Sequence, residues 1–416
     1  MHLLSQPIDG QLGEYLRENL KSPKFNKLEI AVAFAKNSGV LRLKKELEEF
    51  REAGGEIRIF VGVDMNVTSY EALMNLLSLA NSLYVVHDEN GQTFHSKIFS
   101  FSGPEEGLLI VGSHNLTGGG LWTNYESSVH LELDFNNPSH NQLQKSTDSY
   151  FDRLTSFQNT VKSITTTAAI DDLLENSYVE KEVRTRIQMH DREAASAERE
   201  RLFGSSKRSK LPSLNPFPTV SPAPKPPRSS SPQSEIPPAP ITLATNADAT
   251  LWVETRKMTG GSRNILDLSK TSLLRSGDVK NTPYEHSDPD YMRGAVEFFG
   301  IAPEDTDSTK KITINFDGVD YFENTILFPT GKRANGTWRV QIHGVSEIGD
   351  KITSAFNRKA RSGYLLPEKI VCFSRIEADY YYLSVFDDDE LPRFVSSSKI
   401  TAYNGRSSTA RLLGIF

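Results

Sequence analysis

A stretch rich in proline and serine divides the chain into two parts. From Gly204 to Ala249 it reads "GSSKRSKLPSLNPFPTVSPAPKPPRSSSPQSEIPPAPITLATNADA". This composition offers almost nothing to bury and is typical of an extended linker. A chain of 416 residues is long enough for a full hydrophobic core on each side of such a linker. We therefore predict a first domain over residues 1–200, a linker over 201–249 and a second domain over 250–416.

The first part alternates strand and helix patterns. Apolar runs at 28–35 and 56–64 predict strands buried on both faces. Residues 39–55 have helical spacing and end at a glycine pair, and a second helix over 69–81 begins at a serine cap. Further strands are expected at 82–88, 94–102, 107–113 and 126–134, and closing helices at 141–161 and 167–202. Strands and helices in this order, joined by short connections, predict an α/β sandwich.

The second part is rich in short β-strand patterns separated by Gly, Pro, Asn and Asp. Strands are expected at 251–256, 310–316, 337–344, 369–376 and 380–386, and short helices near 289–300 and 387–392. This pattern predicts a mainly-β domain built as a small barrel or pseudobarrel.

Composition narrows the setting of the protein. The net charge of −6 describes the whole chain and leaves a local basic groove open. The single cysteine, Cys372, excludes an internal disulfide and is expected to be a buried small residue. No apolar run approaches the roughly 18 residues of a membrane span, and the first residues lack the pattern of a secretory signal. We expect a cytoplasmic protein without membrane contact.

Reactive side chains are concentrated in "TFHSKIFSFSGPEEGLLIVGSHNLTGGGLWTNYE", residues 93–126. His95 and Lys97 lie two residues apart on a predicted strand, so their side chains should project from one face. Asn115 follows the next predicted strand, and Glu126 begins the one after it. Four polar groups of different chemistry are therefore expected to converge at the ends of adjacent strands.

This set of groups suits phosphodiester cleavage. That reaction needs a nucleophile, donors that stabilise the charged phosphate oxygens, and an acid for the leaving oxygen. His95 is the candidate nucleophile, Lys97 and Asn115 are the candidate donors, and Glu126 is expected to hold the imidazole in its reactive tautomer. The set requires no metal ion and no other cofactor.

Other polar residues are expected to have simpler roles. Asp64 follows a predicted strand, where it is either a carboxylate near the cleft or, as we expect, an ordinary carboxylate at the end of a strand. The remaining strand-like histidines are expected to be packed or solvated: His87, His130 and His343.

The motifs "HSK" at 95–97, "GSHN" at 112–115 and "NYE" at 124–126 resemble the signature of the phospholipase D superfamily. The resemblance covers about residues 1–160. It implies that Ser113 and His114 flank the bound phosphate. The superfamily's aspartate, expected five residues after the lysine, falls at Ser102, which argues more against a lipase than against a nuclease.

The superfamily builds each active site from two copies of the motif, and this chain contains one His-x-Lys. The resemblance therefore implies a homodimer in which His95 of each subunit meets at a shared site. One His95 would form a covalent phosphohistidine, and the other would protonate the leaving group. Water would then complete a hydrolysis that needs no metal ion.

Basic and amide side chains gather in three loop-like segments of the second part, at 254–264, 329–339 and 356–363. They are either solvated turns or arms that reach DNA bases and phosphates. The candidates for DNA contact are Arg256, Lys257, Arg263, Asn264, Lys332, Arg333, Arg339, Arg358, Lys359 and Arg361.

The whole layout resembles the phospholipase D-type restriction endonucleases, in which a dimeric nuclease precedes a DNA-binding pseudobarrel of the B-three type. This resemblance implies a sequence-specific endonuclease acting on double-stranded DNA. Some such enzymes act with a separate ATP-dependent DNA helicase, and this chain has no Gly-x-x-x-x-Gly-Lys-Ser/Thr of its own. Two alternatives stay open, namely a phosphodiesterase acting on lipid or RNA and a non-catalytic DNA-binding protein.

Overall fold

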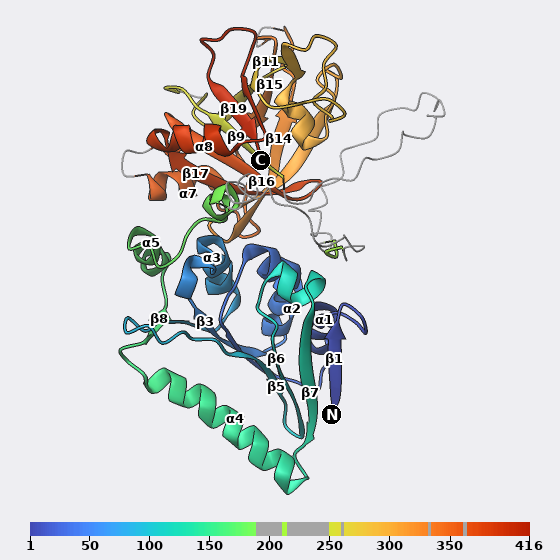
Figure 1. The fold of residues 1–416 in the computed structure, drawn as a ribbon, viewed down its shortest axis with the longest axis vertical. Coiled ribbons are helices and arrows are strands. Elements are labelled where there is room, and N and C mark those ends of the chain that lie inside the picture. The colour runs from blue at the N-terminus through green and yellow to red at the C-terminus, as the bar shows by residue number, and fades with distance from the viewer. Residues whose placement is uncertain (189–209, 214–248, 259–261, 332–333, 361–363) are drawn as a thin grey trace, which may run out of the picture.

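A computed structural model describes residues 1–188, 210–213, 249–258, 262–331, 334–360 and 364–416. The chain forms an N-terminal part around an eight-stranded sheet and a C-terminal part around an eleven-stranded sheet (Figure 1). Most of the expected linker, 201–249, lies outside the described residues.

The N-terminal sheet has the strand order β1-β7-β6-β5-β2-β3-β4-β8. Its strands are β1 (His2–Gln6), β2 (Lys27–Val32), β3 (Glu56–Gly62), β4 (Ser82–Val86), β5 (Lys97–Ser102), β6 (Glu106–Gly112), β7 (Glu126–Asp134) and β8 (Val161–Ile164). β2, β3 and β4 are parallel, and the other pairs are antiparallel. Parallel neighbours need crossover helices, which the chain supplies between them.

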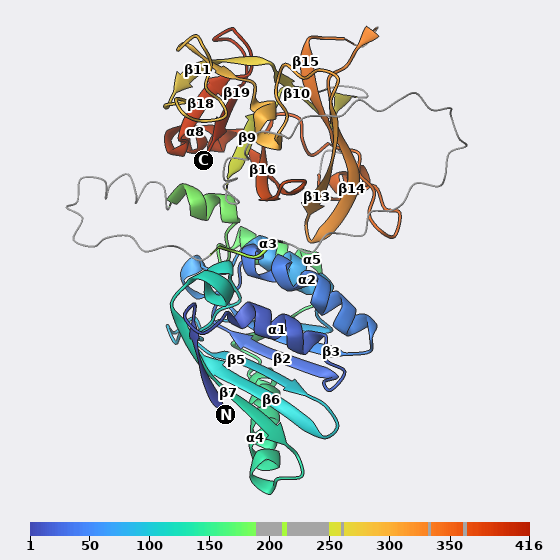
Figure 2. The same ribbon diagram turned by 90° about the vertical axis from the view of Figure 1, so that its right-hand side faces the viewer.

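Helices cover both faces of this sheet, as Figure 2 shows. They are α1 (Leu12–Leu20), α2 (Asn37–Glu52), α3 (Tyr70–Leu79), α4 (Pro138–Ser156) and α5 (Thr167–Glu175), with short turns η1 (Asp64–Asn66) and η2 (Gly119–Thr123). The main core lies on the face of α1, α2 and α3. On the opposite face, Phe151 and Leu154 of α4 pack against Phe60 and Ala31. The mixed α/β architecture expected from the sequence is confirmed.

Two helix boundaries follow their predicted signals. The Ser69 hydroxyl accepts a hydrogen bond from the Ala72 amide at 3.2 Å, which caps α3 as expected. Gly54 follows α2 with φ of +91°, a left-handed conformation that glycine adopts without strain and that ends a helix.

Several expected boundaries were wrong. β5 begins at Lys97, three residues later than predicted, because the Phe94 amide donates to the Asp64 carboxylate instead of joining the ladder. The helix predicted over 141–161 ends at Ser156, and Val161, the last residue of the predicted range, instead begins β8. The helix predicted over 167–202 breaks after α5, where Ser177 has a φ of +62°.

The C-terminal sheet has the order β10-β15-β14-β13-β17-β16-β9-β19-β18-β11-β12. Its strands are β9 (Thr250–Glu254), β10 (Ile265–Ser269), β11 (Thr271–Ser276), β12 (Tyr291–Arg293), β13 (Thr309–Phe316), β14 (Val319–Leu327), β15 (Thr337–Gln341), β16 (Lys369–Glu377), β17 (Tyr380–Asp387), β18 (Ile400–Tyr403) and β19 (Leu412–Ile415). Among the described residues no ladder joins β10 to β12 at the two ends of this order, so the sheet is not a closed barrel. The pseudobarrel stays a prediction.

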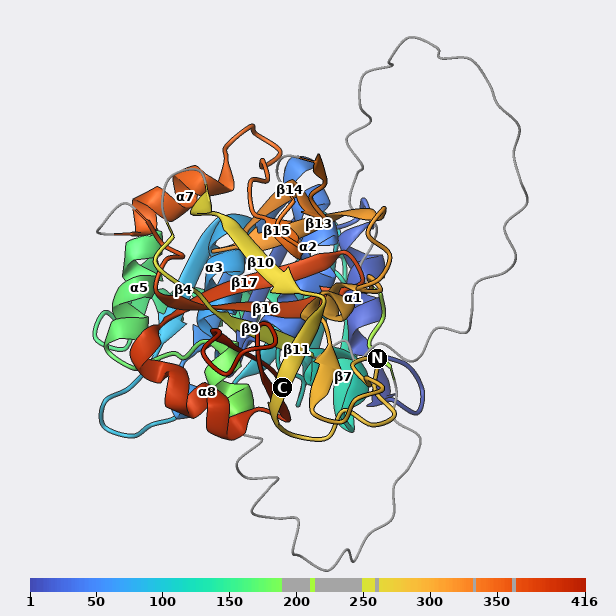
Figure 3. The same ribbon diagram turned by 90° about the horizontal axis from the view of Figure 1, so that it is seen from above.

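Short helices flank this sheet. They are η4 (Ala295–Phe299), α7 (Ile352–Lys359), η6 (Asp388–Glu390) and α8 (Leu391–Ser397). Seen from above, α7 and α8 lie on either side of β16 and β17 (Figure 3). The helix expected over 289–300 is instead β12 followed by the 3-10 turn η4. Cys372 is buried within β16, as expected.

The two parts pack directly against each other. Leu41 of α2 contacts a group of apolar and aromatic side chains of the C-terminal sheet: Ile376, Tyr380 and Tyr382. The ammonium of Lys44 is paired with the carboxylate of Asp320, and both side chains are less than 10% exposed. This contact fixes the C-terminal sheet above the helical face of the N-terminal sheet.

None of the helices in the described ranges has the length and apolar character needed to cross a bilayer.

Candidate active site

The predicted catalytic residues meet at one edge of the N-terminal sheet. β5 begins at this edge, β6 ends there, and β7 begins there, because each of these strands is antiparallel to the next. The same ladders place Ile98 opposite Val111 and Gly112 opposite Ser128. The alternation of strand directions therefore gathers motifs that are up to 31 positions apart in the sequence, from His95 to Glu126.

His95 and Lys97 are in direct contact. Nζ of Lys97 lies 2.7 Å from Nδ1 of His95 and donates to the His95 carbonyl at 2.9 Å. His95 is exposed, whereas Lys97 is 8% exposed. Burial lowers the pKa of Lys97, and the nearby charge of Glu126 opposes this shift. The two side chains were expected to project from one face of a strand; they are in contact, but His95 precedes the strand.

The loop after β6 carries Asn115 and His114 in different orientations. Oδ1 of Asn115 accepts from the Phe34 amide at 3.1 Å, which leaves its Nδ2 donor for another acceptor. His114 is 1% exposed, and its Nδ1 lies 2.8 Å from the Gly120 carbonyl. Burial lowers the pKa of His114, so the neutral ring donates to that carbonyl. This geometry favours His114 as a support of the loop.

Glu126 is fixed by its neighbours in the same chain. The Ser113 hydroxyl donates to one oxygen of Glu126, and Nδ2 of Asn124 donates to the other at 3.3 Å. The Ser113 hydroxyl also accepts from the Ser127 amide at 3.1 Å. We expected Glu126 to hold the His95 ring, but within one chain Lys97 lies against Nδ1 of His95 instead. Lys97 lies only two residues from His95 in the chain, and this closeness explains why Lys97, and not Glu126, contacts the ring.

Asp64 is a site residue that the sequence reading treated as an ordinary strand-end carboxylate. Its Oδ2 accepts from the Phe94 amide at 2.9 Å, and its Oδ1 lies 2.7 Å from Nδ1 of His87. Asp64 is 9% exposed. Because Phe94 precedes His95, this carboxylate anchors the segment that presents His95. The sequence signal that could have identified Asp64 was its position after β3, whose end lies next to the end of β2.

Ser102 lies at the far end of β5 from Lys97. Five residues of strand separate the two by roughly 16 Å. Ser102 is therefore remote from His95 and Lys97.

The assembled edge presents a solvent-exposed imidazole, an ammonium group, a carboxamide donor and a carboxylate held by a hydroxyl. Such a set can attack an electrophilic phosphorus and stabilise the charge that develops on its oxygens. No group of three His, Cys, Asp or Glu side chains able to hold a metal ion occurs within the described residues.

Two of the three predicted DNA-contacting segments converge. Nε of Arg339 donates to Asp267 at 3.2 Å, and Arg256 lies 3.7 Å from the same carboxylate. The Arg263 guanidinium is stacked 3.7 Å from the ring centre of Tyr364, next to Asn264. Three further candidates lie outside the described residues: Lys332, Arg333 and Arg361.

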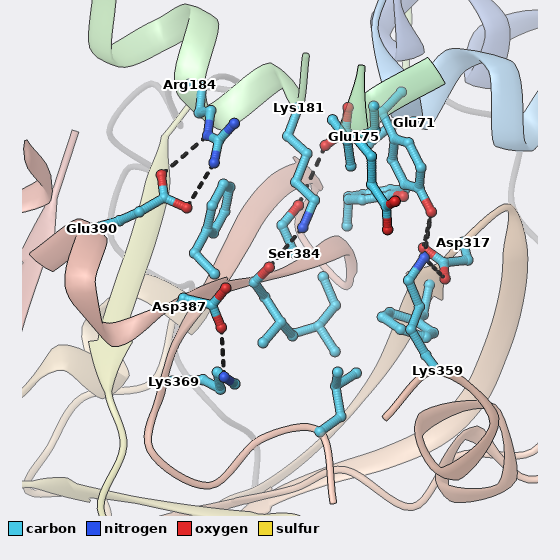
Figure 4. A pocket seen from close by; sticks show the side chains of 18 of the residues that line it. Glu71, Glu175, Lys181, Arg184, Asp317, Lys359, Lys369, Ser384, Asp387 and Glu390 are labelled. Carbon is cyan, nitrogen blue, oxygen red and sulfur yellow. Dashed lines mark hydrogen bonds and ion pairs between the residues drawn. The ribbon is translucent and has the colours of Figure 1, made fainter. Parts of the chain in front are cut away.

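Lys359 lies in a different place, between the two parts of the chain (Figure 4). Its ammonium donates to Asp317 at 2.7 Å and to Asp171 of the N-terminal part at 3.0 Å. Lys359 and Asp317 border a cavity of about 460 Å³ whose lining also includes the Arg184–Glu390 ion pair. Lys359 is therefore placed to join the two parts. The two remaining candidates for DNA contact, Arg358 on α7 and Lys257, are exposed.

No protein-family model matches the chain, and no curated protein sequence matches it. Parts of the chain are similar to solved structures at low identity. Nuc, a phospholipase D family member from Salmonella typhimurium, is 16% identical over 40% of this chain and 97% of its own, with a TM-score of 0.30. NucT from Helicobacter pylori is 15% identical over 37% and 94%, with a TM-score of 0.29. Polyphosphate kinase from Porphyromonas gingivalis is 17% identical over 37% and 21%, with a TM-score of 0.26.

Proposed function

We propose that this protein is a metal-independent, sequence-specific DNA endonuclease of restriction type. The observation that carries the proposal is the convergence of His95, Lys97, Asn115 and Glu126 at one sheet edge, in the motifs that resemble the phospholipase D superfamily. The alternatives, namely cleavage of lipid or RNA and non-catalytic DNA binding, become outcomes of the test below.

In the proposed reaction an imidazole nitrogen of one His95 attacks the phosphorus of the DNA backbone. A P–N bond forms, the bond from phosphorus to the leaving oxygen breaks, and His95 of the second subunit gives that oxygen its proton. Water then attacks the phosphohistidine, the second His95 accepts the proton of the water, and the P–N bond breaks. Lys97 and the Nδ2 donor of Asn115 stabilise the phosphate oxygens in both steps.

A homodimer is required because one chain supplies one His-x-Lys motif. A row of exposed apolar side chains beside the site supports this proposal, because it offers a surface for a second copy of the chain. Leu3 pairs with Val129 and Val129 with Val111 across β1, β7 and β6, and these residues are 61%, 37% and 43% exposed. Val111 precedes Ser113 by two residues. Contiguous apolar surface of this kind marks association faces.

In this proposal the C-terminal part recognises the DNA sequence. Its support is that Arg256 and Asn335 line one groove, since arginine and asparagine are the side chains that most often read guanine and adenine. A separate ATP-dependent helicase is a further proposed partner, and its only support is the resemblance to the phospholipase D-type restriction endonucleases.

The test is cleavage of plasmid DNA in the presence of EDTA. The wild-type chain is expected to cut, His95→Ala is expected to lose cutting, and His140→Ala is the matched control. His140 receives a hydrogen bond from the Asp134 amide at the end of β7 opposite to Glu126. A covalent DNA–protein adduct that survives alkali and is lost in acid would identify the phosphohistidine.

Several results would contradict the proposal. Cutting that needs magnesium, or that survives His95→Ala, would exclude the shared-histidine mechanism. Binding of DNA without cutting, with and without added helicase and ATP, would favour a non-catalytic DNA-binding protein. Hydrolysis of RNA or phospholipid in place of DNA would favour the phosphodiesterase alternatives.

A further inference from the structure

The C-terminal part contains an open groove between the β9–β19 pair and strand β10. The groove has a volume of about 590 Å³ and is located where β10, an end strand of the sheet, faces the chain after β9. β10 and β15 lie on the side of this part that points away from the N-terminal part (Figures 1 and 2). Its polar lining includes Glu254, Arg256, Asp267, Asn335, Thr337 and Arg411.

Asp267 is the centre of one wall. Its Oδ1 accepts hydrogen bonds from Asn335 at 3.2 Å, from Thr337 at 3.3 Å and from Nε of Arg339 at 3.2 Å. Its Oδ2 lies 3.7 Å from Arg256. Three donors thus fix one oxygen of the carboxylate, while the other oxygen has one long contact among the described residues. The side chain is 31% exposed.

Arg256 is the most exposed and least tightly held member of this arrangement. Its side chain is 75% exposed, and its contact with Asp267 is longer than a hydrogen bond. A guanidinium held this loosely can turn its donors towards a ligand without losing a strong partner. The opposite wall differs, because there Glu254 is 7% exposed and fixed by both Arg411 and the Leu412 amide.

A carboxylate at the centre of an arginine-bearing groove indicates which part of DNA enters it. A phosphate would be repelled by Asp267, whereas a base edge carries both donors and acceptors. In the major groove a G·C pair presents the N7 and O6 acceptors of guanine beside the N4 donor of cytosine. Arginine is the commonest partner of those guanine atoms, and a carboxylate accepts from that cytosine donor.

We propose that Asp267 and Arg256 are specificity-determining residues that together read one G·C base pair. This inference rests on the proposed DNA-binding function. Arg256 donates to guanine N7 and O6, and Oδ2 of Asp267 accepts from cytosine N4. Asn335, Thr337 and Arg339 are positioning residues, since their hydrogen bonds to Oδ1 hold the plane of the carboxylate.

The experiment selects binding sites from a pool of random DNA duplexes. The full chain carries His95→Ala and the buffer contains EDTA, so the DNA is not cut. Asp267→Asn and Arg256→Ala are each added to this parent, and exposed residues outside the groove provide the matched controls Asp307→Asn and Arg393→Ala. Thermal unfolding of every variant is measured. Arg256→Ala removes only an exposed side chain, so it tests the groove even if Asp267→Asn disturbs its fold.

The parent and both controls are expected to enrich a G·C pair at a defined position of the site. Both groove variants are expected to lose the preference at that position by about tenfold or more, while the other positions keep theirs. An unchanged preference in Arg256→Ala would overturn the inference. A uniform gain of affinity for all duplexes in Asp267→Asn would also overturn it, because that result assigns Asp267 a purely electrostatic effect.

The failure of the underlying function is distinguishable from the failure of this inference. A parent chain that enriches no sequence at all would overturn both. A parent that enriches a site in which the groove variants alter an A·T position would overturn the inference alone.

Discussion

The ammonium nitrogen of Lys97 lies 2.7 Å from Nδ1 of His95 and 2.9 Å from the carbonyl oxygen of the same residue. A charged Lys97 can only donate, so Nδ1 of His95 accepts and its proton is on Nε2. An imidazole in this tautomer has no free Nε2 lone pair for attack. We infer that a bound phosphate draws Lys97 away from Nδ1 and so releases the ring for its role.

Lys97→Met is therefore expected to lower kcat by about a hundredfold or more, the usual effect of losing one charge-stabilising donor. The measurement is the rate of plasmid cutting, with Lys145→Met on the exposed surface of α4 as the control. A loss confined to KM would contradict a role in the transition state.

The same contact predicts a pH dependence. Burial lowers the pKa of Lys97, so its ammonium loses the proton at a lower pH than an ordinary lysine, whose pKa is about 10.4. Activity that needs this charge should fall on the alkaline side below that value. Lys97→Arg keeps its charge throughout this range, so its residual activity should lack the alkaline decline. A wild-type profile that is flat up to pH 10 would argue against the charged form.

Asp64→Ala is expected to lower kcat by about tenfold while KM changes little. The substitution frees the Phe94 amide and the His87 ring, so the segment that presents His95 loses its anchor, and misplaced groups react slowly. Asp64→Asn keeps an acceptor for Phe94 and should recover part of the rate. Asp172→Asn, on the exposed side of α5, is the control. If alanine and asparagine variants cut as fast as the wild type, Asp64 has no positioning role.

Lys359→Met should weaken the contact between the two parts of the chain. It leaves Asp317 and Asp171 without their shared cation, and Lys359 is 29% exposed, so the expected loss in unfolding free energy is about 1–2 kcal/mol. Urea unfolding measures it. Lys311→Met, in the exposed pair with Glu323, should change stability by less than about 0.5 kcal/mol. Equal effects of the two substitutions would exclude a joining role for Lys359.

Glu71 makes the stability of the protein depend on pH. Burial, together with the charge of Glu182, raises its pKa from the ordinary 4.5 to about 7. The unfolded chain loses this proton first as pH rises, so the stabilisation is complete below about pH 4.5 and is lost as pH rises through about 7.

Glu71→Gln remains neutral and should be more stable than the wild type at pH 8 by about 1–3 kcal/mol. The advantage should be small at pH 4.5, and exposed Glu49→Gln should show no such difference. Urea unfolding at the two pH values provides the comparison. A variant that is equally destabilised at both would show that the carboxylate itself is needed.

Local sequence patterns determined most of the secondary structure around the site. The apolar runs before Asp64 and after Glu106 became buried strands, and Ser69 capped α3, because hydrophobic periodicity and capping depend on residues close in the chain. His95, Lys97, Asn115 and Glu126 were also identifiable, since their spacing places them at strand ends that antiparallel pairing brings together.

Only the tertiary structure decided which partners these groups have. Asp64 contacts Phe94, and Lys97 rather than Glu126 contacts His95, because such contacts depend on where strand ends and loops meet in space. The same holds for Lys359. The basic segment that contains it predicted DNA contact, whereas on α7 its ammonium is paired with Asp171 of the N-terminal part. A residue's type and spacing determine the chemistry it carries, whereas its partner is set by segments far away in the chain.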